Sequence, residues 1–258
     1  MYAAESDRLI RQLGDLGVRP GATVLVHSSF KALGCRDLSP AQVIDALLQA
    51  VGAAGNLLMP ALSYAQQPPE VHDTRTTPSN VGIIPETFRR RAGTLRSLHP
   101  THSICGVGPD VAALFADHAL DTTPCGPHSP LHKLADVGGM ILMLGCGLRP
   151  NTSMHAIEEL HPPVYLFGDE REYVITDVAG NRYRKRYRTH GFQGWEQRYD
   201  RIALLDAPDL CRRGPVLAST SALIRADRLR EVVLDKLKSE PTFFVDREPA
   251  PDVHMLTN

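Results

Sequence analysis

The stretch GGMILMLGCG, residues 138–147, decides the fold of this chain. Its centre, residues 140–144, is a continuous apolar run bounded by glycines. A run of this length without polar alternation is typical of a central strand that is buried on both faces of a sheet. We therefore expect residues 140–144 to lie in the middle of a sheet that is flanked by helices.

Two apolar runs earlier in the chain predict further strands, at residues 23–26 and 57–60. The polar residues His27, Ser28 and Ser29 follow the first of these runs directly. Residues 64–82 are rich in proline, glutamine, threonine and serine, which predicts a long loop. A loop of this length inside a compact domain is usually functional or disordered.

Helices are expected before and between these strands. Residues 5–17 have the periodicity of an amphipathic helix. The apolar face of this helix consists of Leu9, Ile10, Leu13 and Leu16. Ser39, Pro40 and Gln42 have the pattern of a helix N-terminus, so a second helix is expected to run to about residue 51.

The last third of the chain has a different pattern. Residues 172–190 predict an antiparallel hairpin with its turn at residues 180–181, and residues 222–238 predict a terminal helix. Together with the strand, loop and helix order before it, this predicts an α/β fold: a mixed central sheet flanked by helices, with an antiparallel hairpin subdomain. No clean linker interrupts the sequence, so we expect a single domain over residues 1–258.

The composition excludes several classes of protein. With 28 Lys and Arg against 29 Asp and Glu, the net charge is −1, so we expect neither a nucleic-acid partner nor a membrane-surface partner. No apolar run has the length of a membrane span, and the polar start does not have the pattern of a signal peptide. Five widely spaced cysteines favour free thiols in a reducing cytoplasm and no zinc site.

Four polar segments are candidates for chemistry. Residues 27–29 lie at a strand end, where α/β folds place ligands, although a serine helix cap and a surface histidine are the simpler explanation. The stretch from Arg96 to Gly108 has serines, histidines and an arginine that suit an anion or a carbonyl, and a turn-rich loop is the alternative. Residues 125–130 and 188–192 present further histidines, for which a turn and a surface position are simpler interpretations.

A fifth segment, residues 151–159, indicates a general base. A helix here brings His155 close to Glu158 or Glu159. A carboxylate beside an imidazole fixes its tautomer and raises its basicity, which suits proton transfer. Two alternatives stay open: a solvated charge pair, or a metal site that includes His161, whose spacing matches no zinc motif.

Seven segments, taken in order, resemble the aminoglycoside 3-N-acetyltransferase family, whose members are unrelated to the GNAT fold. They are residues 26–34 (VHSSFKALG), 58–60 (LMP), 82–89 (GIIPETFR), 96–103 (RSLHPTHS), 126–130 (GPHSP), 144–147 (LGCG) and 151–158 (NTSMHAIE). The resemblance implies the family's α/β fold. It also implies transfer of an acetyl group from acetyl-CoA to the 3-amino group of the 2-deoxystreptamine ring of an aminoglycoside.

The resemblance implies that two of these segments bind acetyl-CoA. Their serines can donate to phosphates and amides, and Lys31 and Arg96 can pair with phosphates. The implied contacts are His27, Ser28, Ser29, Lys31, Ala32, Leu33, Gly34, Arg96, Ser97, His99, Pro100 and Ser103. No metal is implied, and since family members are often dimers, a homodimer is possible.

The resemblance assigns the catalytic role to His155. We expect this histidine to deprotonate the amine, which then attacks the thioester directly, without an acyl-enzyme. Glu158 or Glu159 is expected to support His155. Thr152 or backbone N–H groups are expected to stabilise the oxyanion, and His27 is expected to be a further active-site histidine.

One departure from the family concerns residues 188–192. Drug-resistance members carry acidic residues there, one of which serves the catalytic histidine, whereas this chain has His190, which we expect to replace that carboxylate. Substrate contacts are expected from Tyr64, Asp73, Glu159 and His190. The alternative functions are acetylation of a non-aminoglycoside amine in biosynthesis by the same fold, and non-catalytic binding of CoA or an amine.

Overall fold

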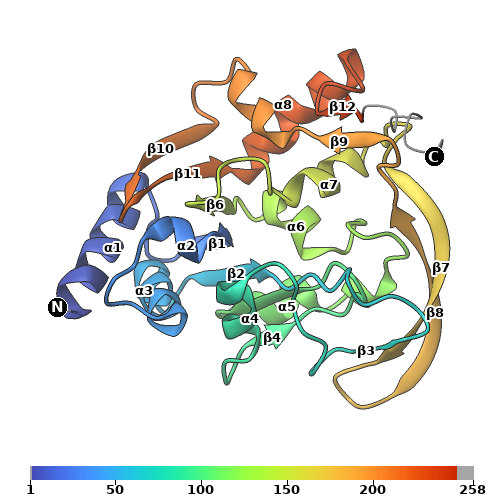
Figure 1. Ribbon diagram of the computed structural model, residues 1–258, viewed down its shortest axis with the longest axis horizontal. Helices are drawn as coiled ribbons and strands as arrows, with labels where there is room; N and C mark the ends of the chain where they lie inside the picture. The colour runs from blue at the N-terminus through green and yellow to red at the C-terminus, as the bar shows by residue number, and fades with distance from the viewer. Residues whose placement is uncertain (1, 249–258) are drawn as a thin grey trace, which may run out of the picture.

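A seven-stranded mixed sheet forms the centre of the molecule. The structure is a computed structural model and describes residues 2–248. The strands are β1 Thr23–Ser28, β2 Asn56–Pro60, β4 Leu95–Arg96, β5 Ile104–Val107, β6 Met140–Leu144, β10 Cys211–Val216 and β11 Ser219–Arg225. They lie side by side in the order β10-β11-β6-β1-β2-β5-β4 (Figure 1).

The middle of the sheet is parallel and its two sides are antiparallel. Strand β1 pairs in parallel with β6 and β2, whereas β11, β10, β5 and β4 run antiparallel to their neighbours. The prediction for β6 is confirmed. Ile141 and Met143 face one apolar core and Leu142 and Leu144 face the other, each at most 1% exposed.

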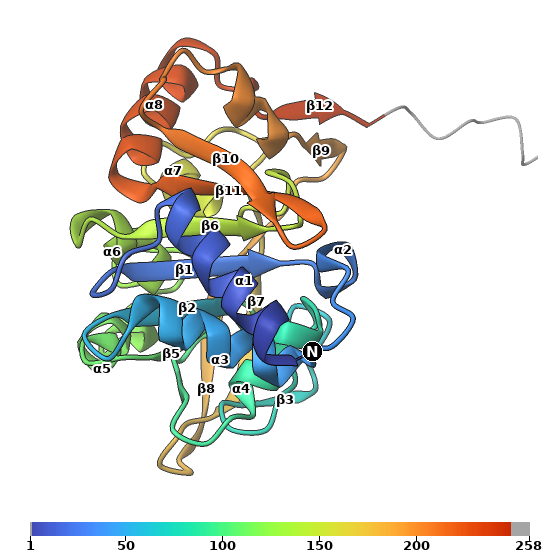
Figure 2. The same cartoon turned by 90° about the vertical axis from the view of Figure 1, so that its left-hand side faces the viewer.

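Helices cover both faces of the sheet. On one face, which is turned toward the viewer in Figure 2, lie α1 Tyr2–Leu16, α3 Pro40–Val51 and α4 Ile83–Arg89. On the other lie α5 Val111–Phe115, α6 Pro130–Asp136, α7 Ser153–Glu158, α8 Ala226–Ser239 and the 3-10 helix η2 Tyr199–Leu204. Two further short helices are α2 Phe30–Leu33, which follows β1, and the 3-10 helix η1 His118–Leu120.

The two helices predicted near the N-terminus are confirmed. In α1, Leu9 and Leu13 are fully buried on the predicted apolar face. In α3, the Ser39 hydroxyl accepts the N–H of Gln42, and the Gln42 side chain accepts the N–H of Ser39 in return. This reciprocal cap satisfies donors that would otherwise lack partners, which explains where the helix begins.

The predicted hairpin consists of β7 Phe167–Thr176 and β8 Arg182–His190, and it begins five residues earlier than expected. It curves along the side of the molecule opposite α1 (Figure 1). A third strand, β3 Val71–Asp73, pairs in parallel with β7. The predicted long loop over residues 64–82 is confirmed except at this strand, which was missed because three residues are too few to show a strand periodicity. Farther along the chain, β9 Trp195–Gln197 pairs with β12 Val245–Arg247.

The prediction of a helix over residues 222–238 is wrong at its N-terminal end. Residues 222–225 belong to β11, where they pair antiparallel with β6. Ala222, Leu223 and Ile224 are buried in this pairing, and α8 begins only at Ala226. No turn residue separates strand from helix in the sequence, so the local apolar pattern did not reveal the boundary.

The expected single domain over residues 1–258 stays a prediction, and residues 1 and 249–258 of it lie outside the described part of the chain. Within residues 2–248, no helix combines the length and the apolar character that crossing a membrane requires.

Candidate active site

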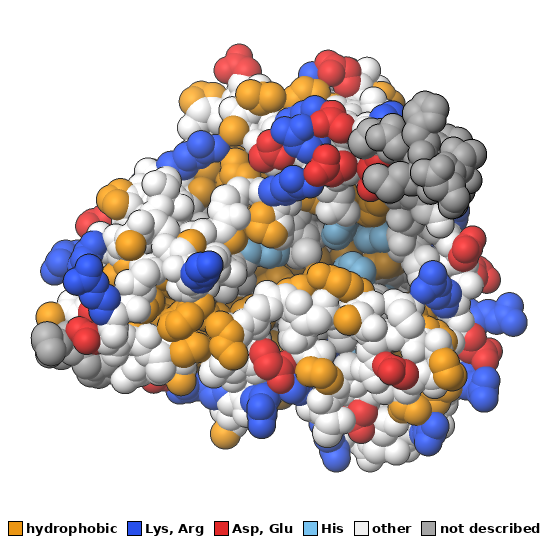
Figure 3. Space-filling view, in the orientation of Figure 1, with side chains coloured by type: hydrophobic (Ala, Val, Ile, Leu, Met, Phe, Trp, Pro, Cys, Tyr) orange, Lys and Arg blue, Asp and Glu red, His pale blue; other side chains and the backbone are white. Residues whose placement is uncertain are grey.

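Residues from distant parts of the sequence meet at one edge of the sheet. Strands β6, β1 and β2 all end there, and because Pro60 of β2 pairs with Ile104, the turn before β5 lies at the same edge. Ligands of α/β sheets bind outside the carboxyl ends of such strands. A cavity of about 410 Å³ opens here, and Figure 3 shows histidines at the bottom of a hollow in this face.

The short helix α7 places His155 in the wall of this cavity. Asn151 Oδ1 accepts the N–H of Ser153 at 3.1 Å and so caps the helix. Thr152 holds the N-cap position, but its hydroxyl is buried without a hydrogen-bond partner among residues 2–248 and lies beside the cavity. One helical turn then puts His155 and Glu158 on the same face.

Glu158 is fully buried behind His155 and is held by two tyrosines. Its Oε1 accepts the hydroxyl of Tyr165 at 2.9 Å, and its Oε2 accepts the hydroxyl of Tyr199 at 2.7 Å. The Nδ1 of His155 lies 3.0 Å from the Tyr199 oxygen and 3.3 Å from Glu158 Oε2. With Nδ1 engaged by this pair, Nε2 is the nitrogen left for a substrate.

Burial keeps both tyrosines protonated. It raises the pKa of Tyr165 and the pKa of Tyr199 well above the usual value, and the neighbouring Glu158 carboxylate raises both further. Each hydroxyl therefore remains a donor to Glu158. The Tyr199 oxygen can then accept the Nδ1–H of His155, which fixes the tautomer of the imidazole.

Glu159 serves a different histidine. Its Oε1 accepts His190 Nε2 at 2.7 Å and the N–H of Cys125 at 2.8 Å, while Oε2 accepts the hydroxyl of Thr123. Burial lowers the pKa of His190 well below its usual value, with a smaller effect from His155, and burial raises the pKa of Glu159. The rings of His190 and His155 lie 4.7 Å apart, centroid to centroid.

His27 and Ser28 line the cavity from the end of β1. Burial, followed by the charge of His155, lowers the pKa of His27 to about 3, so this ring is neutral at pH 7. His27 Nε2 and Ser28 Oγ are buried and have no hydrogen-bond partner in the described residues. Buried polar atoms of this kind at a cavity wall are available to a ligand.

A family profile described as aminoglycoside 3-N-acetyltransferase matches residues 25–238. Aminoglycoside N(3)-acetyltransferase IV from a Salmonella species is 31% identical over 248 residues, which cover 95% of this chain and 91% of that relative. The chain belongs to the aminoglycoside 3-N-acetyltransferase family.

Solved structures of similar proteins confirm the predicted fold class. AAC-IIIb in binary complex with CoASH has a TM-score of 0.80 at 25% identity, covering 95% of this chain and 98% of that one. A histidine-to-alanine variant of AAC(3)-IVa in complex with a gentamicin has a TM-score of 0.78 at 30% identity. The match covers 93% of this chain and 90% of that one.

In this family member, the residues expected to hold acetyl-CoA fall into two groups. The first follows β1: His27 and Ser28 line the cavity, and Lys31, Ala32 and Gly34 are exposed on and after α2. Ser29 is the cap of α2, since its hydroxyl accepts the N–H of Ala32 at 3.4 Å. Leu33 is buried in the apolar core.

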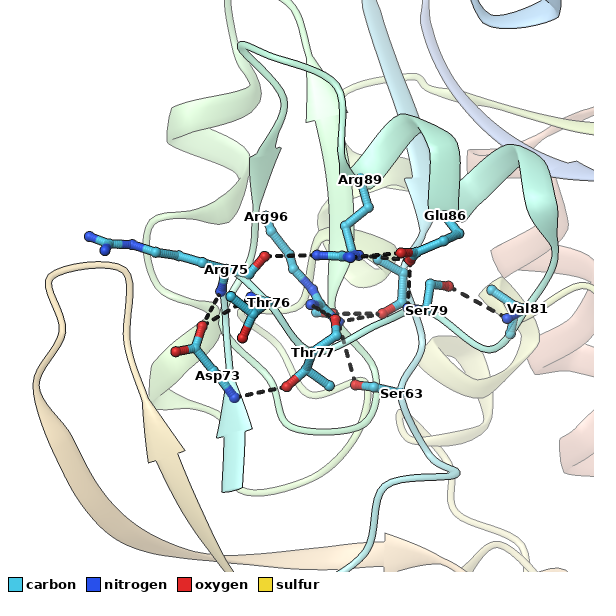
Figure 4. A network of polar contacts seen from close by, with 12 residues as sticks. Ser63, Asp73, Arg75, Thr76, Thr77, Ser79, Val81, Glu86, Arg89 and Arg96 are labelled. Atoms are coloured by element: carbon cyan, nitrogen blue, oxygen red, sulfur yellow. Dashed lines mark hydrogen bonds and ion pairs between the residues drawn. The ribbon is translucent and has the colours of Figure 1, made fainter. Parts of the chain in front are cut away.

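The second group, around the half-buried Arg96, lies away from this cavity. The Arg96 guanidinium donates to Ser103 Oγ at 2.8 Å and to the Ala61 carbonyl at 2.9 Å. It also donates to the Thr77 carbonyl at 2.5 Å (Figure 4). Burial lowers the pKa of this guanidinium to about 10, so the group stays charged. Protein acceptors take these donors, and the phosphate contact expected of Arg96 stays a prediction.

The neighbours of Arg96 are also engaged internally. Ser97 Oγ accepts the N–H of Ile104, and His99 Nδ1 accepts the N–H of His102 at 2.9 Å. Ser97 and His99 are only 1% exposed, and Ser103 is fully buried. The Pro100 carbonyl accepts the Ser63 hydroxyl. The segment 96–103 therefore shapes the turn that carries His102 into the cavity, and none of its predicted CoA contacts lines that cavity.

The predicted substrate contacts also separate. Tyr64 is half-exposed at the cavity wall, whereas Asp73 lies away from it, where its Oδ1 accepts the N–H groups of Arg75 and Thr76. Asp73 therefore stabilises the turn after β3, and its expected contact with substrate stays a prediction. Near the cavity, Glu196 forms an ion pair with Arg149.

The remaining candidates have structural roles or lie elsewhere. Ser129 caps α6, and His128 pairs with Asp121 at 2.8 Å in the turn before it. His161 is exposed after α7, so it does not join His155 and Glu159 at a metal site. The sequence marked the segment that contains His102 but did not select this residue for the cavity, and nothing near Tyr199 in the chain marks it as a cavity residue.

We predict that Arg96→Ala lowers the free energy of unfolding by at least about 3 kcal/mol, since it leaves several buried acceptors unpaired. Thermal unfolding measures this, and Arg90→Ala, at an exposed arginine nearby, is the control with little effect. Unchanged stability together with a raised KM for acetyl-CoA would instead support the phosphate contact.

The buried histidines predict a loss of stability in mild acid. Burial lowers the pKa of each of His27, His72, His99, His102, His118 and His190. The unfolded chain then binds more protons below pH 6.5, so the free energy of unfolding falls as the pH drops, by about 1 kcal/mol per histidine at pH 5.5. The raised pKa of Glu159 acts oppositely, but it is one group against six.

The melting temperature between pH 7.5 and pH 5.5 measures this effect. We expect a steep, reversible decrease on the acid side. A melting temperature that is constant across this range would show that the buried rings are already protonated in the folded protein.

Proposed function

We propose that this protein transfers the acetyl group of acetyl-CoA to the 3-amino group of the 2-deoxystreptamine ring of aminoglycosides. The observation that carries the proposal is the orientation of His155, whose Nδ1 is held by Tyr199 and Glu158 while its ring faces the cavity. Membership of the family supports it, as do the relatives bound to CoASH and to a gentamicin.

In the proposed mechanism, His155 is the general base. Its Nε2 removes a proton from the substrate amine, and the amine nitrogen attacks the thioester carbonyl carbon. The unpartnered Thr152 hydroxyl beside the cavity donates to the developing oxyanion. The C–S bond then breaks, and the CoA thiolate takes the proton from His155, so no acyl-enzyme forms.

The segment after β1 is our candidate for the acetyl-CoA contact. Ser28 Oγ has no partner in the described residues and can donate to an amide or a carbonyl of the pantetheine chain. Lys31 is exposed on α2, which follows β1 directly, and can pair with a phosphate. Ala32 and Gly34 contribute backbone only.

One observation favours the alternative, an acetyltransferase of a less cationic amine. A polycationic substrate prefers acidic walls. Here Glu158 and Glu159 lie behind histidines, Glu196 is paired with Arg149, and Asp200 is paired with Arg198. Tyr64 and His190 then supply neutral contacts for an amino sugar.

The proposal also includes a cellular location and an oligomeric state. All five cysteines are free thiols, which supports a cytoplasmic location. The homodimer stays a prediction.

A thiol-release assay with acetyl-CoA tests the function. We expect release with gentamicin-, kanamycin- or neomycin-type compounds, and NMR of the product places the acetyl group on the 3-amine. Release only with simple monoamines would favour the alternative. Binding of acetyl-CoA without turnover of any amine would contradict both and indicate a binding protein.

We predict that His155→Ala lowers kcat by roughly 10²–10⁴-fold, because the proton acceptor is lost. Acetyl-CoA affinity, measured by calorimetry, should stay near the wild-type value. His161→Ala, at an exposed histidine just after α7, is the matched control with unchanged turnover. Near-normal turnover in His155→Ala would remove the general base from the mechanism.

A further inference from the structure

Three histidines from distant parts of the chain converge in the cavity. His102 comes from the turn before β5, His155 from α7 and His190 from the end of β8. One ring nitrogen from each lies within 4.8 Å of the other two. The ring centroids are 6.0 Å apart for His102 and His155, 5.3 Å for His102 and His190, and 4.7 Å for His155 and His190.

The protein engages one nitrogen of each ring and leaves the other. His155 Nδ1 meets the Tyr199 oxygen at 3.0 Å, His190 Nε2 meets Glu159 Oε1 at 2.7 Å, and His102 Nδ1 meets the Thr101 oxygen at 2.9 Å. The second nitrogen of His190, Nδ1, is buried without a partner in residues 2–248. Each ring therefore has one nitrogen with a protein partner and a second nitrogen that can carry a lone pair, and the three rings form one group at the cavity.

This arrangement has the outer contacts of a metal site. Histidines that bind a metal donate their other N–H to a carboxylate, a carbonyl or a similar acceptor, which fixes the tautomer and the ring orientation. Glu159 does this for His190, and the Tyr199–Glu158 pair does it for His155. Imidazole nitrogen suits zinc, which accepts three histidines and leaves a fourth position open.

The distances allow such a site after a small movement. Zinc binds imidazole nitrogen at about 2.0–2.1 Å, so the ligand nitrogens of a tetrahedral site lie roughly 3.4 Å apart. The three nitrogens are at most 4.8 Å apart here. Ring rotations that close about 1.5 Å bring them onto one ion, and the cavity supplies the fourth position.

We propose that His102, His155 and His190 bind a zinc ion, and that the bound ion blocks acetyl transfer. The lone pair of His155 that accepts the substrate proton becomes a bond to the metal, so the base is lost while zinc is present. The metal is thus an inhibitor that competes for the active site. The binding part of this proposal is independent of the reaction, and the blocking part rests on the proposed function.

Calorimetry of the full chain with ZnCl₂ tests the binding. We expect one ion per chain in the wild type. His102→Gln and His190→Gln should each lower the affinity by at least about tenfold, and Glu159→Leu, which removes the acceptor of the His190 N–H, by roughly 10–100-fold. The matched control His161→Gln should bind as the wild type does, and MgCl₂ should give no heat, because Mg²⁺ prefers oxygen ligands.

Cobalt absorption identifies the ligands without any assay of activity. Four-coordinate Co²⁺ gives visible bands, which should be lost in His190→Gln although its circular dichroism is unchanged. Cys146, which also lines the cavity, is the competing donor, so Cys146→Ser should keep the bands. No bands in the wild type, or bands that depend on Cys146 and not on His190, would overturn the site.

Inhibition tests the second part. Zinc should lower the formation of acetylated product, measured by mass spectrometry because zinc also binds the released thiol, and a chelator should restore it. If zinc binds at the histidines but does not inhibit the reaction, the blocking role is overturned and the zinc site itself stands. If no amine is turned over at all, the proposed function fails, and calorimetry and cobalt absorption alone decide the site.

Discussion

The buried carboxylate of Glu158 is the contact on which the candidate active site depends. A carboxylate removed from water costs several kcal/mol unless hydrogen bonds replace its solvent. Here the replacements are the hydroxyls of Tyr165 and Tyr199, from the segment after α7 and from η2, and they tie both to α7. The same contacts hold the Nδ1 side of His155, so the requirement that stabilises the fold also orients this imidazole.

The next residue repeats this arrangement toward a different partner. Glu159 accepts from His190 and from the backbone of Cys125, which anchors the end of the hairpin to the turn before α6. Two successive carboxylates thus support two imidazoles in one cavity wall. The cavity wall therefore presents imidazoles, and the two carboxylates lie behind them. This arrangement suits proton transfer and metal binding more clearly than it suits the binding of a polycation.

Strong local signals allowed much of the fold to be predicted from the sequence. The apolar run of β6 and the reciprocal cap at Ser39 depend only on neighbouring residues, and the hairpin turn is also local. The parts that were missed depend on distant partners: β3 exists because it pairs with β7, and Tyr199 reaches Glu158 across 41 residues of sequence. The internal partners of Arg96 were also missed, because the carbonyls that accept from it lie 19 and 35 residues away in the sequence.

The central claim is that Nδ1 of His155 carries the proton of the neutral ring and that Nε2 holds a lone pair toward the cavity. Nitrogen-15 NMR of the histidine-labelled full chain measures this most directly, with the spectrum of His155→Gln used for assignment. We expect a protonated, pyrrole-type Nδ1 and an unprotonated, pyridine-type Nε2. The opposite tautomer, with the proton on Nε2, would contradict it, because the nitrogen facing the substrate could not accept a proton.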